Sequence, residues 1–219
     1  MTNKYYTLMA SLPRLEKDFT SGIRIPIDRD ALFFRLKELN EEDQKEMKIL
    51  FSFSKKLHKP MLLTDQEVLD LYVDTHKKLK YDFLKEMILD GLTLRLALYV
   101  FRKRKMGEVS EIPVGPFPII KHISNNTDHP DLKLASRIPY ISTIRETINT
   151  GSVLEAEKII DEHKWKVSEK MDEGEFFSFK SFISYFIKWD IIFRWSRIDS
   201  DTGVVSFENI LGEVQRYEY

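Results

Sequence analysis

Apolar residues recur every three or four positions along most of this sequence, which is the period of an α-helix with one buried face. Asp28 and Asn40 are residue types that cap helix N-termini, and each precedes an apolar stripe. Thr64–Glu67 forms a capping box, Thr-x-x-Glu, ahead of a further stripe. Residues 79–105 continue the pattern as one long helix or two abutting helices. The pattern predicts an all-α protein, a bundle of long amphipathic helices.

The C-terminal third contains a long amphipathic helix and the most apolar of the expected helices. Gly151-Ser152 opens an amphipathic helix that ends at Asp172–Gly174, and 204–216 are expected to form a last short helix. Between them, residues 176–198 carry apolar side chains around well over half of the helix perimeter. Three phenylalanines repeat there at seven-residue intervals, namely Phe179, Phe186 and Phe193. This distribution favours a core helix, buried on several sides, over a binding helix.

Glycine and proline are scarce at 8 each, and four of them lie between Pro113 and Pro118. Residues 107–130 are therefore expected to be a linker or long loop. That segment divides the chain into an N-terminal helical part, 1–106, and a C-terminal helical part, 131–219. The two parts pack either as two helical lobes or as a single domain.

The charge balance and the absence of cysteine exclude several classes of function. The 34 basic and 35 acidic residues give a formal charge of −1, so nucleic acid is not an expected partner. Without cysteine there is no thiolate nucleophile and no cysteine-ligated zinc, and the composition fits a cytoplasmic protein. The most apolar window, 176–198, carries several charges, so no membrane span is expected. Those charged residues are Lys180, Lys188, Asp190, Arg194 and Arg197.

Motifs for catalysis and cofactor binding are missing from the sequence. It contains no phosphate-binding loop, dinucleotide fingerprint, nucleophile elbow or His-Glu-x-x-His zinc motif. We therefore expect no catalytic residue, no cofactor and no metal. One cluster, His122 with Asp128 and His129, is either a metal site or an ordinary polar loop, and its position beside Pro130 favours the loop.

The basic run Arg102–Lys105 is the most prominent charge cluster. It could contact nucleic acid, phospholipid or an acidic protein surface. Cations are also favoured at the C-terminal end of a helix by the helix dipole. The run contains no interleaved aromatic residue and the protein is close to neutral, so the pattern favours the helix end.

Two stretches carry a resemblance to a known family. Tyr5-Tyr6-Thr-Leu-Met-Ala-Ser11-Leu-Pro13 resembles the start of an uncharacterised bacterial family whose genes tend to lie among those for V/A-type ATPase subunits. The stretch from Phe177 to Gly203, with its Lys-Trp-Asp and Arg-Trp pairs, resembles the C-terminal helix of the same family. The first stretch is also weakly similar to the start of the C-type subunit of those ATPases, which eukaryotes call the d-type. Ser11 stands where the C-type family has arginine, and this chain is shorter than its members.

The resemblance implies a non-catalytic, protein-binding subunit of a V/A-type ATPase. Like the C-type protein, it would couple the central shaft to the membrane rotor ring, with central-stalk and membrane-ring subunits as its partners. It would then be cytoplasmic and peripheral to the membrane through those partners. The alternatives are a free-standing helical assembly factor or binding module, and an enzyme of unrecognised type. The expected partner interface consists of aromatic and basic residues: Tyr5, Tyr6, Arg102, Arg104, Arg194 and Arg197.

Overall fold

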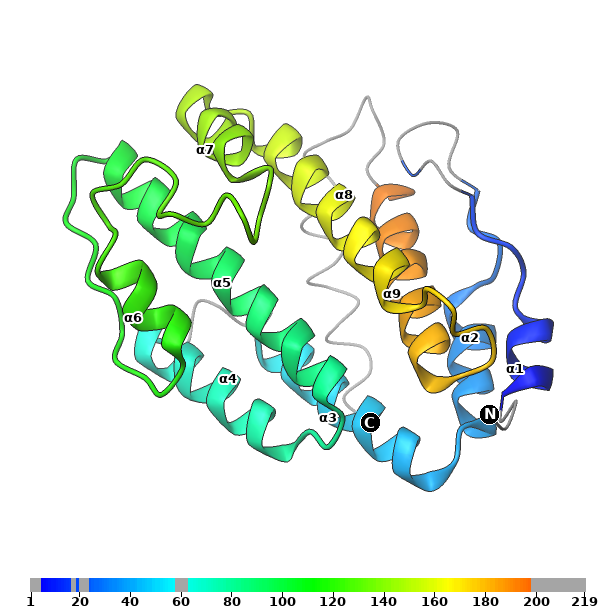
Figure 1. Cartoon of the computed structure of the whole chain (residues 1–219). Coiled ribbons are helices and arrows are strands. Elements are labelled where there is room, and N and C mark those ends of the chain that lie inside the picture. Colours follow the sequence, from blue (N-terminus) through cyan, green and yellow to red (C-terminus); the bar gives the residue numbers. More distant parts are fainter. Residues whose placement is uncertain (1–4, 17–18, 20–23, 58–62, 198–219) are drawn as a thin grey trace. The chain divides into compact units, whose positions relative to one another are not determined.

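A computed structural model describes residues 5–16, 19, 24–57 and 63–197 (Figure 1). Every regular element in these ranges is helical, which confirms the expected all-α fold. The expected helix at 204–216 lies outside the described residues. The elements are α1 (Tyr6–Ser11), α2 (Arg29–Arg35), the 3₁₀ turn η1 (Leu36–Glu38), α3 (Glu41–Leu57), α4 (Asp65–Lys78), α5 (Asp82–Lys105), α6 (Pro118–Ser124), α7 (Ile141–Thr150), α8 (Val153–Met171) and α9 (Phe179–Trp195).

Contacts between residues group the chain into two compact units. Unit 1 combines Met1–Glu38 with Lys164–Tyr219, and unit 2 is Leu39–His163. Unit 2 is thus inserted into unit 1, and the boundary at His163 falls inside the continuous helix α8. This grouping differs from the division at 107–130 that the sequence suggested, because the ends of the chain belong to one unit.

The segment expected to be a linker, 107–130, lies within unit 2 and contains helix α6. Pro118 occupies the first turn of α6, where its missing N–H is no loss. A Cβ atom on Gly115 would lie only 2.7 Å from Leu69 Cδ2 and 2.8 Å from Ile120 Cδ1, so the backbone approaches those side chains closely. In this segment the glycine allows the backbone to lie close to neighbouring side chains, and the proline begins a helix.

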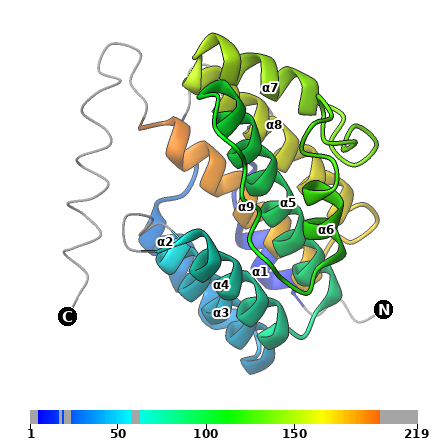
Figure 2. The ribbon, with the colours of Figure 1, turned by 90° about the vertical axis from the view of Figure 1, so that its left-hand side faces the viewer.

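Within unit 2, α3 packs on α4, α4 on α5, and α5 on α6 and α7. The view in Figure 2 shows α6 and α7 beside α5. The predicted caps form: Asn40 Oδ1 accepts from the Asp43 N–H at 2.9 Å, and the Thr64–Glu67 capping box is complete. Residues 82–105 are one uninterrupted helix, and Gly91 lies against the ring of Tyr72.

The start of α5 is capped by side chains from α3. The Glu46 carboxylate accepts from the backbone N–H of Lys80 at 3.0 Å and more weakly from that of Tyr81 at 3.5 Å. The Tyr81 hydroxyl donates to Asp43 Oδ1 at 2.6 Å. Both carboxylates are buried. The two N–H groups that Glu46 accepts belong to the residue before the N-cap of α5 and to the N-cap itself, so these contacts join α3 to the start of α5.

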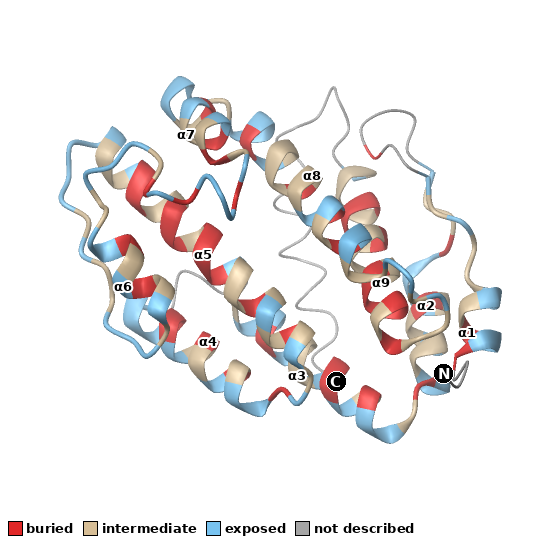
Figure 3. Ribbon diagram, viewed as in Figure 1, coloured by how far each residue is buried: buried red, intermediate tan, exposed pale blue. Residues whose placement is uncertain are grey.

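Helix α9 lies at the centre of unit 1, and Figure 3 shows buried residues along its length. The Trp189 indole N–H donates to the Ile27 carbonyl at 2.9 Å, and the Tyr185 hydroxyl donates to the Pro13 carbonyl at 2.9 Å. Burial raises the pKa of Tyr185 to about 12. The interpretation of this aromatic segment as a core helix is confirmed by its buried side chains, Phe179, Phe182, Ile183, Trp189, Ile191 and Ile192.

A helix that crosses a lipid bilayer must be both long and apolar. None of the helices in the described part of the chain combines the two properties.

Candidate interaction surface

The two tyrosines at the start of α1 differ sharply in exposure. Tyr5 is 4% exposed, and its backbone N–H donates to the carbonyl of Phe177 at 3.2 Å. Tyr6 is 58% exposed, and its ring centroid lies 4.8 Å from that of Phe177. Of the two tyrosines expected at an interface, Tyr6 lies on the surface and Tyr5 belongs to the core.

The two arginines at the end of α9 lie over neighbouring side chains of the same helix. Arg194 Nε lies 3.3 Å from Asp190 Oδ2. The guanidinium of Arg197 lies 4.4 Å from the ring centroid of Phe193, which in turn stacks on Trp189. Both arginines place positive charge at the carboxyl end of α9, where the helix dipole favours it.

Helix α9 separates these arginines from Tyr6. Phe177, which Tyr6 contacts, lies two residues before the first residue of α9, and Arg194 lies in its last turn. Seventeen helical residues span roughly 25 Å. The expected interface residues of unit 1 therefore form two separate groups, and Arg102 and Arg104 belong to unit 2.

The basic run at the end of α5 is largely occupied by contacts within unit 2. Lys103 pairs with Glu108, and that hydrogen-bonded ion pair raises the pKa of the lysine. Lys105 Nζ donates to the carbonyl of Ile148 in the last turn of α7, at 2.6 Å. Arg102 is exposed, and its side chain makes no hydrogen bond or ion pair with another described residue. Of the three, only Lys103 is paired with a carboxylate, and Lys105 is bonded to a neutral carbonyl, so the run keeps positive charge at the end of α5.

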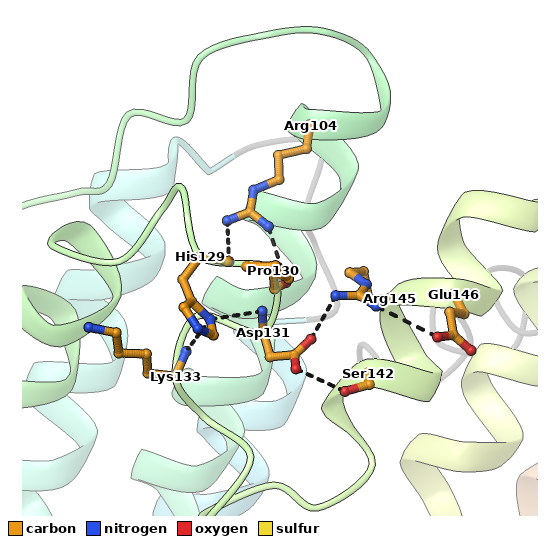
Figure 4. Close-up of polar contacts among 8 residues, drawn as sticks. All are labelled: Arg104, His129, Pro130, Asp131, Lys133, Ser142, Arg145 and Glu146. Atoms are coloured by element: carbon orange, nitrogen blue, oxygen red, sulfur yellow. Dashed lines mark hydrogen bonds and ion pairs between the residues drawn. The ribbon is translucent and has the colours of Figure 1, made fainter.

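Arg104 holds the loop that follows α6, as Figure 4 shows. Its guanidinium donates to the carbonyls of His129 and Pro130, at 2.7 and 3.2 Å. Desolvation lowers the pKa of Arg104, with a smaller opposing effect from Asp128. In the same loop, Asp131 accepts from Arg145 at 2.8 Å and is also bonded to Ser142 of α7. The expected interface residue Arg104 thus has a structural contact within its own unit.

The histidines considered as metal ligands contribute to the same loop. His122 Nε2 lies 3.0 Å from the Leu132 carbonyl, and His129 Nδ1 accepts from the N–H groups of Asp131 and Lys133. These bonds stabilise a turn in which Leu132 and Lys133 have φ of 54° and 52°. Within the described ranges, no group of three or more His, Cys, Asp or Glu side chains is arranged to hold a metal ion. The hydrogen bonds of His122 and His129 give both side chains a structural part in this loop.

Comparison with known proteins gives the chain a family. A family model described as "Protein of unknown function (DUF2764)" matches residues 34–217. The chain belongs to the DUF2764 family. No curated protein and no solved structure matches it. The DUF2764 match confirms the expectation of an uncharacterised family and carries no link to an ATPase, so that association stays a prediction.

One exposed side chain of this DUF2764 protein is not among the residues expected at an interface. Phe176 falls inside the expected helix 176–198, yet it is 75% exposed. The helix begins at Phe179 instead, because the Ser178 hydroxyl caps it by accepting from the Ser181 N–H at 3.2 Å. Serine is a strong N-cap residue, so Ser178 is the sequence signal that places Phe176 in the preceding loop.

Proposed function

We propose that this DUF2764 protein is a non-catalytic, protein-binding subunit of a V/A-type ATPase, similar to the C-type subunit. In that role it couples the central shaft to the membrane rotor ring. The proposal takes its partners from the resemblance of the two terminal stretches. It takes its mode of action from a helical fold that presents aromatic and basic side chains on its surface.

The observation that carries the proposal is that the two resembling stretches meet in unit 1. Tyr5 bonds to Phe177 through backbone groups, and Tyr185 bonds to Pro13. Segments more than 160 residues apart in sequence therefore form one module. Because the two stretches pack together, both similarities fall in the same unit. This supports the interpretation that they reflect one binding unit and are not two chance similarities.

Affinity purification from the native cell tests this role. The tagged full-length chain should retrieve the shaft and ring subunits of the ATPase in a fixed ratio, in a complex that hydrolyses ATP. Recovery of no ATPase subunit would overturn the proposal. Recovery only with partly assembled complexes, and absence from the intact enzyme, would favour the alternative of an assembly factor.

The basic end of α9 offers a variant for the same experiment. Replacing Arg194 and Arg197 together by glutamate should lower recovery of the ATPase subunits at least fivefold, because it reverses the charge of a group that reaches the surface. A matched control replaces Lys55 and Lys56, two exposed cations in the last turn of α3, by glutamate. Circular dichroism should show equal helix content for both variants. Equal recovery of partners would remove the end of α9 from the interface.

A further inference from the structure

We propose that four residues of unit 1 form a docking surface for a segment of a partner protein that carries lysine or arginine beside apolar side chains. This aromatic–acidic surface consists of Tyr6, Glu173, Glu175 and Phe176. The inference rests on the proposed protein-binding function and specifies the chemistry of the partner. It concerns a different part of the molecule from the basic end of α9.

Two large aromatic side chains are exposed to solvent at this surface. Phe176 is 75% exposed and Tyr6 is 58% exposed. They come from the α8–α9 loop and from α1, and Phe177 connects them: it follows Phe176 in the chain and lies with its ring against Tyr6. Exposed aromatic residues gathered from separate segments are typical of sites that bind a partner.

The backbone holds Phe176 in place without burying it. Before it, Gly174 adopts φ of 79°, which favours glycine, and the Glu175 N–H donates to the Asp172 carbonyl at 2.9 Å. After it, the Phe177 carbonyl accepts from Tyr5, and Ser178 caps α9. A side chain presented on an ordered turn loses little conformational entropy when a partner covers it.

The charge around these rings selects the partner. Residues 171–179 contain three acidic residues and no lysine or arginine. Asp172 is paired with Lys188 at 3.5 Å, whereas Glu173 and Glu175 form no ion pair with another described residue. A basic partner segment would pair with these two carboxylates. Its cations could also lie on the aromatic faces, which attract positive charge.

The same charges argue against other occupants. Nucleic acid and anionic phospholipid would bring negative charge against Glu173 and Glu175. A second copy, docked symmetrically, would place this same acidic surface against itself. Like charges facing each other across an interface disfavour such a complex. A basic and apolar protein segment is the occupant that satisfies both the rings and the carboxylates.

Purification of tagged variants tests the surface in the native complex. Phe176→Ala, and separately Glu173→Lys with Glu175→Lys, should each lower recovery of the ATPase subunits about tenfold, whereas Phe34→Ala should leave recovery unchanged. Phe34 is a matched control, because it is 64% exposed in the same unit on α2. If the wild type retrieves the ATPase and both surface variants retrieve it equally well, the docking surface is overturned while the proposed function stands.

A second measurement tests the docking surface without assuming that the partner is an ATPase subunit. A synthetic helical peptide of leucine and lysine should bind the purified full-length chain, and a leucine–glutamate peptide of the same pattern should not. Phe176→Ala should weaken binding of the lysine peptide at least fivefold, and Phe34→Ala should not. Failure of the lysine peptide to bind, or equal loss in both variants, overturns the proposal. A wild-type dimer that Phe176→Ala converts to monomer would also overturn it, in favour of a second copy as occupant.

Discussion

The indole N–H of Trp189 donates a hydrogen bond to the backbone carbonyl of Ile27 at 2.9 Å, and both residues are buried. The bond joins the central helix of unit 1 to the residue just before the cap of α2. Because water has little access to the Ile27 carbonyl, the indole N–H supplies the hydrogen bond that water would otherwise provide.

Trp189→Phe should therefore destabilise the protein by about 1–3 kcal/mol, since a buried acceptor loses its donor and the smaller ring leaves space. Urea unfolding followed by circular dichroism measures the difference. Tyr185→Phe is a useful comparison, because its bond to Pro13 is only partly buried and its loss should cost less. Equal stability of Trp189→Phe and wild type would show that this bond contributes little.

The contact of Glu46 with the start of α5 predicts a graded effect. Glu46→Ala should lower the free energy of unfolding by about 1–3 kcal/mol, because the N–H groups of Lys80 and Tyr81 lose a buried acceptor. Glu46→Gln keeps an acceptor oxygen and should lose less. Amide hydrogen exchange at Lys80 and Tyr81 should accelerate in the alanine variant first. Unchanged protection of these two amides would contradict the capping role.

The left-handed turn after Asp131 predicts a stabilising substitution. Lys133 is exposed and has φ of 52°, a conformation that costs an ordinary L-residue about 1–2 kcal/mol. Lys133→Gly should raise the free energy of unfolding by up to about 1 kcal/mol, after the greater flexibility of glycine in the unfolded chain is subtracted. Lys133→Ala keeps the strain and should leave stability nearly unchanged. A glycine variant no more stable than the alanine variant would exclude this strain.

The capping box of α4 predicts a pH dependence. The Glu67 carboxylate accepts from the backbone N–H of Thr64 at 2.7 Å and from its hydroxyl at 2.9 Å, and these bonds lower the pKa of Glu67 below its ordinary 4.5. The folded state thus binds this proton less readily than the unfolded state does. The stabilisation is fully present above the ordinary pKa and is lost as the pH falls through the lowered pKa.

Comparison of wild type with Glu67→Gln measures this effect. Their difference in free energy of unfolding should be constant well above pH 4.5 and should shrink as the pH falls below it. Glu86→Gln makes the same replacement at an exposed position of α5 and is the matched control for the substitution. A Glu67→Gln difference that does not change on acidification would contradict the role of the ionised carboxylate.

The starts of the helices could be predicted from sequence because their signals are local. Asp28 caps α2 through the Ala31 N–H, and Thr64 caps α4 within its own four residues. At a helix end, Gly151 adopts φ of 84° and its N–H donates to the carbonyl of Thr147 in α7, two residues before α8 begins at Val153. Each of these contacts joins residues three or four positions apart, so the sequence contains both partners side by side.

The environment of the candidate site residues could not be predicted, because it depends on distant partners. Tyr5 is buried through a contact with Phe177, and Arg104 is occupied by carbonyls 25 and 26 residues further along the chain. The mixture of glycine and proline in 107–130 does not reveal α6, since Pro118 favours both a turn and the first turn of a helix. Periodicity identifies a buried face, but it does not identify what covers that face.

The insertion of unit 2 into unit 1 has a consequence for synthesis on the ribosome. Residues 39–163 emerge as one continuous stretch, so unit 2 can fold as soon as His163 has left the exit tunnel. The N-terminal residues that bond to Phe177, Tyr185 and Trp189 cannot form these contacts until later, because the three partners are translated after unit 2. During the synthesis of unit 2, the apolar N-terminal segment of the nascent chain therefore lacks its partners from α9 and the loop before it. A chaperone that binds nascent chains can bind this segment during that time.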